Sequence, residues 1–210
     1  MCFASDMGVT VFFGGTFNPP HIAHKQMLMA AESIAEVERI IVVPTNIPPH
    51  KDFKGYVAKG EHRLNMCKIM CKDSKKSVVS DMELNRGGRS YSFDTLKELS
   101  KDYDELYILI GGDMITTFDT WYKYEEVIKI AGILAVRRPD VDNSEFDKAV
   151  KFLMGKGAKI IEVYAQTKNV SSTEIRDTAL IGNGEVMNSM LPEGVYEYIK
   201  ENGLYPKNDK

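Results

Sequence analysis

The stretch that decides the fold is "VTVFFGGTFNPPHIAH", residues 9–24. Its first half is an apolar run typical of a buried strand, and its second half holds two glycines, two prolines and two histidines. Gly14 and Gly15 let the backbone approach a ligand and adopt conformations that other residues avoid. The Asn-Pro-Pro sequence at 18–20 imposes an extended turn that directs the following helix. We therefore expect a strand, a tight loop and a helix in that order.

The two histidines of this stretch, His21 and His24, share one face of a helix because they are three residues apart. That face points back toward Gly14 and Gly15, since helical side chains lean toward the N-terminus. Amides of a glycine turn, the positive end of a helix and two imidazoles together suit the phosphates of a nucleotide. The alternative is a plain strand-to-helix turn with surface histidines, and the spacing alone leaves both interpretations open.

Short apolar runs rich in valine and isoleucine recur beyond this stretch and alternate with segments of helical spacing. The runs lie at 39–44, 77–81, 105–112, 132–139 and 158–164, and the helical segments at 25–37, 61–71, 92–99 and 125–130. This alternation predicts an α/β fold, a Rossmann-like doubly wound parallel sheet with helices on both faces. In such sheets ligands bind beyond the carboxyl ends of the strands. The loops at 14–20 and 110–113 lie there.

Residues 171–205 replace the strand pattern with helical segments. Ser171 and Glu174 have the spacing of a capping box, and Gly203 suits a helix end. We expect a C-terminal helical segment packed on the sheet, within one domain that covers residues 1–210.

Composition and charge argue against several classes of protein. The chain has 210 residues, of which 43% are hydrophobic, and a formal net charge of -3. No broad basic field favours nucleic acid or an anionic membrane, and neither a signal peptide nor a bilayer-spanning segment is visible. The three cysteines show no paired spacing, which indicates a reducing compartment and a cytoplasmic protein. We expect Cys67 and Cys71 to be buried on a helix.

Two motifs carry a resemblance to a known superfamily. "GGTFNPPHIAH" at 14–24 resembles the first signature of the HxGH nucleotidyltransferases, and "VSSTEIR" at 170–176 resembles their second, about 150 residues later. Asn18 stands where aspartate is usual, and Ala23 stands where the second glycine of HxGH is usual. Asparagine keeps the shape and the hydrogen bonding, and alanine adds one methyl group, so we expect tuned activity, not its loss.

The resemblance implies transfer of a nucleotide from a triphosphate to a phosphate-bearing acceptor, with release of pyrophosphate. It assigns catalysis to His21, His24 and Arg176, with His24 as the main group that steadies developing charge. It assigns ATP binding to Gly14, Gly15, Thr16, Phe17, Gly111, Asp113, Ser171, Ser172 and Thr173. Magnesium is the expected cofactor, carried mainly by the ATP phosphates and water, with no metal site on the protein.

The middle of the chain indicates the acceptor. Four stretches resemble the nicotinate mononucleotide adenylyltransferases of bacterial NAD synthesis: "VVPTNIPPHK" at 42–51, "ELNRGGRSYSFDTL" at 83–96, "IGGDMITTFDTWYKYEEVI" at 110–128 and "VRRP" at 136–139. With the two signatures and the closing "LPEGVYEYIKENGLY", the resemblance covers nearly the whole chain. It implies transfer of AMP to nicotinate mononucleotide. The implied acceptor-binding residues are Asn46, His50, Lys51, Ser92, Trp121 and Tyr122.

In this family resemblance Trp121 stacks on the pyridine ring, and backbone amides near Ser92 and Tyr122 receive the nicotinate carboxylate. Charge-assisted hydrogen bonds of that kind favour nicotinate over nicotinamide mononucleotide. The loop at 46–51 then holds the phosphate or ribose of the acceptor. Asp113 faces the nucleotide ribose or a magnesium ion, or is an ordinary turn residue.

Arg137 and Arg138, at the end of an apolar run, are either phosphate partners or a solvated pair.

Other interpretations stay open at this point. A phosphopantetheine adenylyltransferase or a cytidylyltransferase would share the HxGH-like motif, but not "PPHK", "SYSFDTL" and "TWY" together. A nucleotide-binding sensor without turnover is supported only by Asn18 and Ala23. The kinship of the fold with tRNA synthetases suggests RNA, but no basic aromatic surface supports it. ATP and nicotinate mononucleotide are thus the expected partners, without nucleic acid or membrane, and a homo-oligomer is possible.

Overall fold

The computed structural model describes residues 8–48, 56–138, 142–166 and 168–206. Within these residues, parallel strands form a single sheet in the order β3-β2-β1-β4-β5-β6. The strands are β1 (Val9–Gly15), β2 (Val37–Pro44), β3 (Ser77–Val79), β4 (Leu106–Gly111), β5 (Gly132–Arg137) and β6 (Ile160–Tyr164). The predicted doubly wound α/β fold is therefore confirmed.

The central strands supply two cores because their side chains alternate between the faces of the sheet. In β4, Leu106, Ile108 and Ile110 pack on one face, and Tyr107 and Leu109 pack on the other. All five are buried. A strand without a solvent-facing side has no reason to alternate polar and apolar residues, which explains the continuous apolar runs of the sequence.

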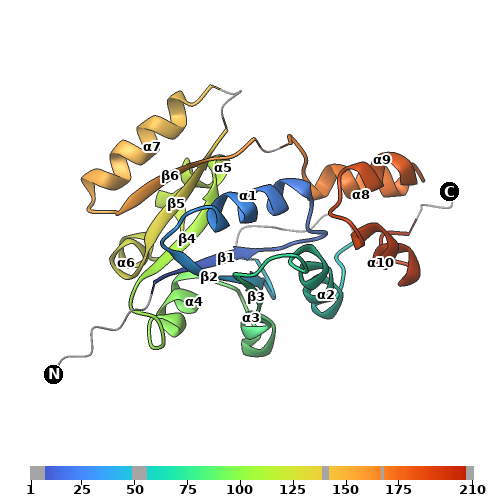
Figure 1. Cartoon of the computed structure of the whole chain (residues 1–210), viewed down its shortest axis with the longest axis horizontal. Helices are drawn as coiled ribbons and strands as arrows, with labels where there is room; N and C mark the ends of the chain where they lie inside the picture. Colours follow the sequence, from blue (N-terminus) through green and yellow to red (C-terminus); the bar gives the residue numbers. More distant parts are fainter. Residues whose placement is uncertain (1–7, 49–55, 139–141, 167, 207–210) are drawn as a thin grey trace.

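Helices cover both sides of the sheet (Figure 1). Helices α1 (Ile22–Glu32) and α2 (Gly60–Met70) pack on one face, and α4 (Ser92–Leu99), α6 (Tyr124–Ile130) and α7 (Ser144–Gly155) pack on the other. Shorter elements complete the connections: α3 (Met82–Arg86), α5 (Gly112–Ile115) and the 3-10 helix η1 (Phe118–Thr120). The thiols of Cys67 and Cys71 are buried at the end of α2, as predicted, and burial raises the pKa of both.

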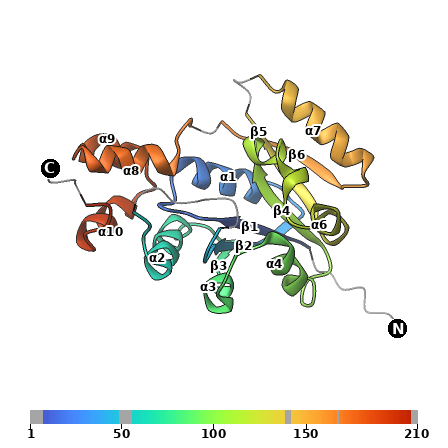
Figure 2. The ribbon, with the colours of Figure 1, turned by 180° about the vertical axis from the view of Figure 1, so that it is seen from behind.

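The chain from residue 168 to residue 206 contains three helices. Helices α8 (Ser172–Leu180), α9 (Gly184–Ser189) and α10 (Val195–Glu201) lie together at one end of the molecule, near α2 (Figures 1 and 2). They share a separate apolar cluster with α2, in which Met66 meets Ile175 and Val195. The end of the chain is thus anchored beside the helix that follows β2.

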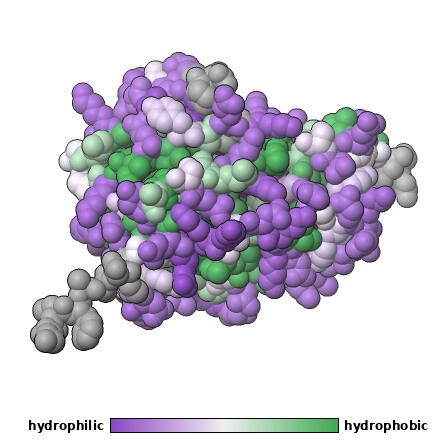
Figure 3. All heavy atoms as spheres, viewed as in Figure 1, coloured by the Kyte–Doolittle hydropathy of each residue, from purple (hydrophilic) through white to green (hydrophobic). Residues whose placement is uncertain are grey.

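The largest difference from the predicted boundaries concerns the first helix. The helix expected at 25–37 begins at Ile22 and ends at Glu32, and Val37 already starts β2. No described helix combines the length and the apolar character that a membrane crossing requires. Figure 3 shows a face on which hydrophilic side chains predominate and apolar ones form small separate patches.

The order of the strands fixes the place of the ligand site. The chain moves outward from β1 to β3 and then returns to β4 on the other side of β1. The connections after β1 and β4 therefore leave the sheet in opposite directions, and a crevice opens between them at the carboxyl ends of these strands.

Candidate active site

A cavity of about 940 Å³ lies at this crevice. Its walls come from the loop after β1, the first turn of α1, the loops after β2 and β4, the segments 90–92 and 121–122, and the start of α8. The walls include these residues predicted from the sequence: Gly14, Gly15, Thr16, His21, His24, Ser92, Gly111, Asp113, Trp121, Tyr122, Ser171, Ser172, Thr173 and Arg176. The fold thus brings both signatures and the acceptor motifs to one cavity.

Three predicted acceptor residues need separate description. His50 and Lys51 lie outside the described residues. Asn46 is not among the residues that line the cavity. Its backbone N–H donates to Ser90 Oγ (2.8 Å), and its Nδ2 donates to the Gly88 carbonyl (3.1 Å). In this structure the Asn46 side chain joins the loop after β2 to the loop before α4.

Phe17 belongs to the loop of residues 14–20, which we name the phosphate-binding loop after its expected role. Its side chain is buried, its φ is 47°, and its ring meets the His24 ring edge-on with centroids 4.9 Å apart. Phe17 is therefore the residue of this loop with a left-handed backbone conformation. The prediction that Gly14 and Gly15 adopt conformations that other residues avoid is wrong. The reason for the glycines is space, because a Cβ at Gly14 would lie 2.5 Å from the Phe12 ring. One at Gly15 would lie 2.9 Å from the Phe17 ring.

The two histidines stack at the N-terminus of α1. Their ring centroids are 3.6 Å apart with an interplanar angle of 22°, and the backbone N–H of His21 donates to Nδ1 of His24 (3.1 Å). Because Nδ1 accepts, the proton of a neutral His24 ring lies on Nε2, which is then a donor. The pair stands at the positive end of the α1 dipole, so an anion in the cavity meets a helix terminus and imidazole donors together.

The second signature is joined to the first across the cavity floor. Ser172 Oγ donates to the Pro19 carbonyl (2.9 Å), and Arg176 Nη1 donates to the Asn18 carbonyl (2.9 Å). The members of these pairs are 153 and 158 residues apart in the chain. The two hydrogen bonds therefore join distant segments into one structural unit.

The N-terminus of α8 is capped and polar. Ser171 Oγ accepts from the backbone N–H of Glu174 (3.1 Å), which is the N-cap half of the predicted capping box. Arg176 Nη2 donates to Thr173 Oγ1 (3.1 Å), so the guanidinium is held over the first turn of the helix. Hydroxyls, amides and a guanidinium converge here, which is the donor set that binds pyrophosphate groups.

The other end of the cavity is aromatic. The Trp121 ring is half-buried and packs on Phe118 with centroids 4.8 Å apart and an interplanar angle of 32°. The Tyr122 ring is exposed and lies 4.5 Å from the Tyr91 ring. Since Trp121 is supported by Phe118 and also lines the cavity, it offers a flat apolar surface to a heteroaromatic ring.

Glu83 lines the same cavity, although the sequence analysis gave it no role in the site. Its carboxylate is buried and accepts from Thr95 Oγ1 (2.5 Å), with Ser90 also facing it. Burial raises the pKa of this carboxyl, and the hydrogen bonds from Thr95 and Ser90 oppose that shift. Because Ser90 also accepts from Asn46, the carboxylate supports both loops at the aromatic end of the cavity. The sequence signal was its place at the head of the stretch 83–96.

The two consecutive arginines after β5 differ from each other. Arg138 lines the cavity. Arg137 donates instead to Glu162 Oε2 (2.8 Å) and to Asp147. The two arginines are therefore neither two phosphate partners nor a solvated pair. Arg138 faces the cavity, and Arg137 forms ion pairs with two carboxylates.

Asp113 is exposed at the cavity wall just after β4. Over the described ranges, no group of three or more His, Cys, Asp and Glu side chains is arranged to hold a metal ion.

Sequence comparison identifies the family. Residues 12–178 match the family model described as cytidylyltransferase-like. The chain is 34% identical over 196 residues to the Listeria innocua protein named "Probable nicotinate-nucleotide adenylyltransferase", with 92% of this chain and 95% of the relative covered. It is 34% identical over 201 residues to the protein of the same name from Geobacillus kaustophilus, with 95% and 87% covered.

Solved structures agree in fold. The Plasmodium falciparum nicotinic acid mononucleotide adenylyltransferase complexed with NaAD superposes with a TM-score of 0.75 at 21% identity, over 94% of this chain and 97% of that one. The same enzyme complexed with APC gives a TM-score of 0.74, also at 21% identity and with the same coverage. The chain belongs to the cytidylyltransferase-like family, among the nicotinate-nucleotide adenylyltransferases.

Proposed function

We propose that this chain transfers AMP from ATP to nicotinate mononucleotide, forming nicotinate adenine dinucleotide (deamido-NAD) and pyrophosphate in the synthesis of NAD. The observation that carries the proposal is the division of one cavity into two ends. The His21–His24 stack and the α8 N-terminus offer donors to phosphates at one end, and Trp121 offers a ring surface at the other. The names of the relatives support this assignment.

The reaction is an in-line displacement at phosphorus. An oxygen of the acceptor phosphate forms a bond to the α-phosphorus of ATP, while the bond from that phosphorus to the bridging oxygen breaks. The electron pair leaves with pyrophosphate. The acceptor phosphate is ionised near neutral pH, so no protein group has to remove a proton, and the protein acts by orientation and by offsetting charge.

The charge that develops on the leaving pyrophosphate meets fixed donors. His24, with its Nε2 proton, and Arg176, held over the first turn of α8, are the groups we assign to this charge. His21 completes the imidazole pair. Because these groups are already in place before the reaction, they offset charge without further reorganisation.

We assign the nicotinate carboxylate to the backbone amides near Ser92 and Tyr122, and the pyridine ring to Trp121. Ser92 is the first residue of α4, so its amide belongs to the unpaired N–H groups of a helix N-terminus. A carboxylate gains charge-assisted hydrogen bonds from such donors that a carboxamide does not match. This supports nicotinate mononucleotide as the preferred acceptor.

Magnesium enters, in this proposal, as part of the ATP substrate. When bound, it would neutralise phosphate charge. We assign Asp113 as the carboxylate that would face the ion, because it is exposed on the cavity wall. We place the activity in the cytoplasm, since the buried thiols of Cys67 and Cys71 suit a reducing compartment.

The test is pyrophosphate release from MgATP with three acceptors in parallel: nicotinate mononucleotide, nicotinamide mononucleotide and phosphopantetheine. We expect release with the first and much less with the other two. Release with phosphopantetheine alone would overturn the acceptor assignment at Trp121. ATP binding without release in any reaction would identify a nucleotide-binding protein without turnover.

A further inference from the structure

We propose that Tyr205 is a positioning residue for catalysis: its hydroxyl acts through Asn18 to hold the phosphate-binding loop in the conformation that presents His21 and His24 to ATP. The inference rests on the proposed function and adds to it a residue from the far end of the chain. Tyr205 follows α10 and contacts Asn18 across 187 positions of sequence.

The first observation is that both polar atoms of the Asn18 side chain are hydrogen-bonded. It is 1% exposed. Its Oδ1 accepts from the Tyr205 hydroxyl (2.8 Å) and from the backbone N–H of Ala58 (3.0 Å), and its Nδ2 donates to the Tyr56 carbonyl (3.2 Å). An asparagine can both accept and donate here, whereas an aspartate would set an oxygen against the Tyr56 carbonyl. The departure from aspartate at this position thus has a local reason.

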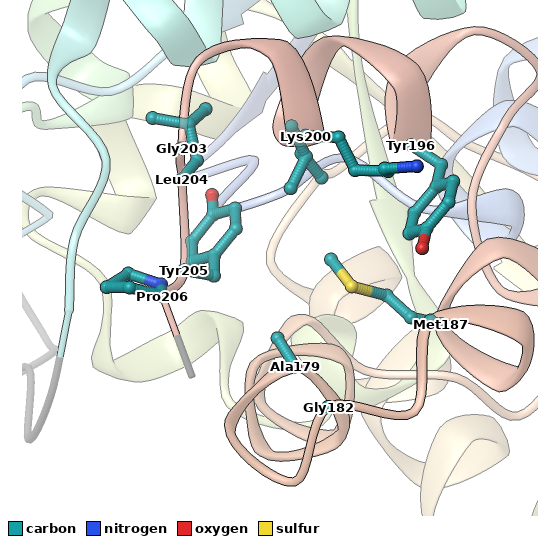
Figure 4. Close-up of a pocket in the computed structure, with 11 residues that line it drawn as sticks. Ala179, Gly182, Met187, Tyr196, Lys200, Gly203, Leu204, Tyr205 and Pro206 are labelled. Atoms are coloured by element: carbon teal, nitrogen blue, oxygen red, sulfur yellow. The ribbon is translucent and has the colours of Figure 1, made fainter. Parts of the chain in front are cut away.

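The second observation is that Tyr205 is held in place independently of Asn18. Its side chain is buried, its φ is 53°, and its ring meets the Tyr56 ring edge-on at 5.3 Å. Figure 4 shows Tyr205 beside Leu204 and Pro206 at the border of a hollow of about 280 Å³ that Ala179 and Met187 also line. Burial raises the pKa of the hydroxyl, so it stays a proton donor throughout the working pH range.

The third observation is that the backbone around Asn18 bears the catalytic groups. The Asn18 carbonyl accepts from Arg176, the preceding Phe17 ring packs against His24, and the chain enters α1 shortly after. Arg63, which is 3% exposed, completes the support by donating to the carbonyls of Thr16 (2.9 Å) and Ala58 (3.0 Å). A displacement of Asn18 therefore moves the His24 ring and the Arg176 partner together.

A simpler interpretation is that Tyr205 is only a core aromatic residue. Tyr205→Phe distinguishes the two interpretations, because it keeps the ring and removes the hydrogen bond from the hydroxyl to Asn18. Tyr198→Phe is the matched control. Tyr198 lies on α10, and its hydroxyl bonds to two residues of α2, His62 (3.0 Å) and Asn65 (3.1 Å).

The kinetic experiment measures pyrophosphate release from MgATP and nicotinate mononucleotide. We expect Tyr205→Phe to lower kcat roughly tenfold and to raise the KM for ATP, with the KM for nicotinate mononucleotide unchanged, because small displacements of catalytic groups are costly in rate. Tyr198→Phe should match the wild type. Equal kinetics for the wild type and Tyr205→Phe would overturn the proposal, and so would a rise in the KM for the acceptor alone.

A double-mutant cycle tests the route through Asn18. When Asn18→Ala is already present, Tyr205→Phe should change kcat less than about twofold, since the bond it removes no longer exists. A full tenfold loss in that background would show that Tyr205 acts independently of Asn18, contrary to the proposal.

A spectroscopic measurement decides the matter even if the wild type releases no pyrophosphate, in which case the proposed function fails on its own. The side-chain nitrogen resonances of the histidines are compared among the wild type, Tyr205→Phe and Tyr198→Phe with MgATP present. Tyr205→Phe should shift the signals of His21 and His24 and spare His62, and Tyr198→Phe should do the reverse. Unshifted His21 and His24 signals in Tyr205→Phe would contradict the inference.

Discussion

His24 joins three features at a single position: the first turn of α1, a stacked partner ring and a backbone donor that fixes its tautomer. We expect His24→Ala to lower kcat on the order of a hundredfold or more, because one preorganised donor is lost from the transition state. Pyrophosphate release measures the rate, and thermal denaturation shows whether the fold persists. His62→Ala, which alters a histidine on α2, is the control and should retain activity. Unchanged turnover in His24→Ala would refute the assignment.

Trp121 acts, in our proposal, on binding and not on the chemical step. We expect Trp121→Ala to raise the KM for nicotinate mononucleotide about tenfold while the KM for ATP stays the same, because the stacking surface is lost only at the acceptor end. Trp121→Phe keeps an aromatic face and should recover most of the affinity. Steady-state kinetics with each substrate varied in turn test this, and a change confined to ATP would contradict it.

At the scale of elements, Glu83 on α3 supports the loop after β2 and the start of α4 at once. Its pKa is raised above the ordinary value of 4.5, so the native protein holds this proton more tightly than the unfolded chain does. Wild-type stability therefore falls as the pH rises from the ordinary value through the raised one. Glutamine does not titrate, so the stability of Glu83→Gln lacks this pH dependence. The free energy of unfolding of Glu83→Gln minus that of the wild type should therefore increase as the pH rises from 4.5 through the raised pKa, and then level off.

Urea denaturation at a series of pH values measures this difference. The charged neighbours are Arg86, whose Nη2 lies 3.8 Å from the carboxylate, and Arg63. Glu98→Gln is the matched control, since Glu98 is exposed and also pairs with Arg86 (3.0 Å). A flat difference for Glu83→Gln would show that burial does not perturb this carboxyl.

The helices and strands also show which features sequence patterns predict and which they do not. Continuous apolar runs revealed the strands because both faces of the sheet are covered. The spacing of Ser171 and Glu174 correctly predicted the cap of α8. By contrast, the role of Gly14 was inferred from backbone freedom, and the structure shows that the Phe12 ring requires the space. Phe12 is only two residues before Gly14 on β1, but the direction in which its ring turns is set by three-dimensional packing and is not visible in the sequence.

At the scale of the whole molecule, the phosphate end of the cavity joins residues of the first and last parts of the chain. Bound MgATP should therefore stabilise the entire fold. At a concentration about 100-fold above its Kd, we expect roughly 2.7 kcal/mol of stabilisation, or a rise in Tm of roughly 5–10 °C for a chain of this length. Arg176→Ala should reduce this rise at the same concentration. Arg39→Ala, which changes an exposed arginine on β2, should not.

The distant contacts explain what the sequence did not predict. The two signatures were visible as motifs, and the strand order brings their residues to one cavity. Glu83 was not assigned because its importance comes from burial, and Tyr205 was not assigned because its partner Asn18 is 187 residues away in the sequence. Periodicity and spacing describe neighbours along the chain, whereas these residues act on neighbours in space.

The bond between Asn18 and Tyr205 also bears on the order of events during synthesis. A ribosome delivers the phosphate-binding loop early and its anchor 187 residues later. A nascent chain that has passed residue 176 already contains His21, His24 and Arg176, yet the loop that carries the histidines is still without its last support. By our inference, a chain interrupted before Tyr205 therefore contains every group that we assign to catalysis but works below its full rate.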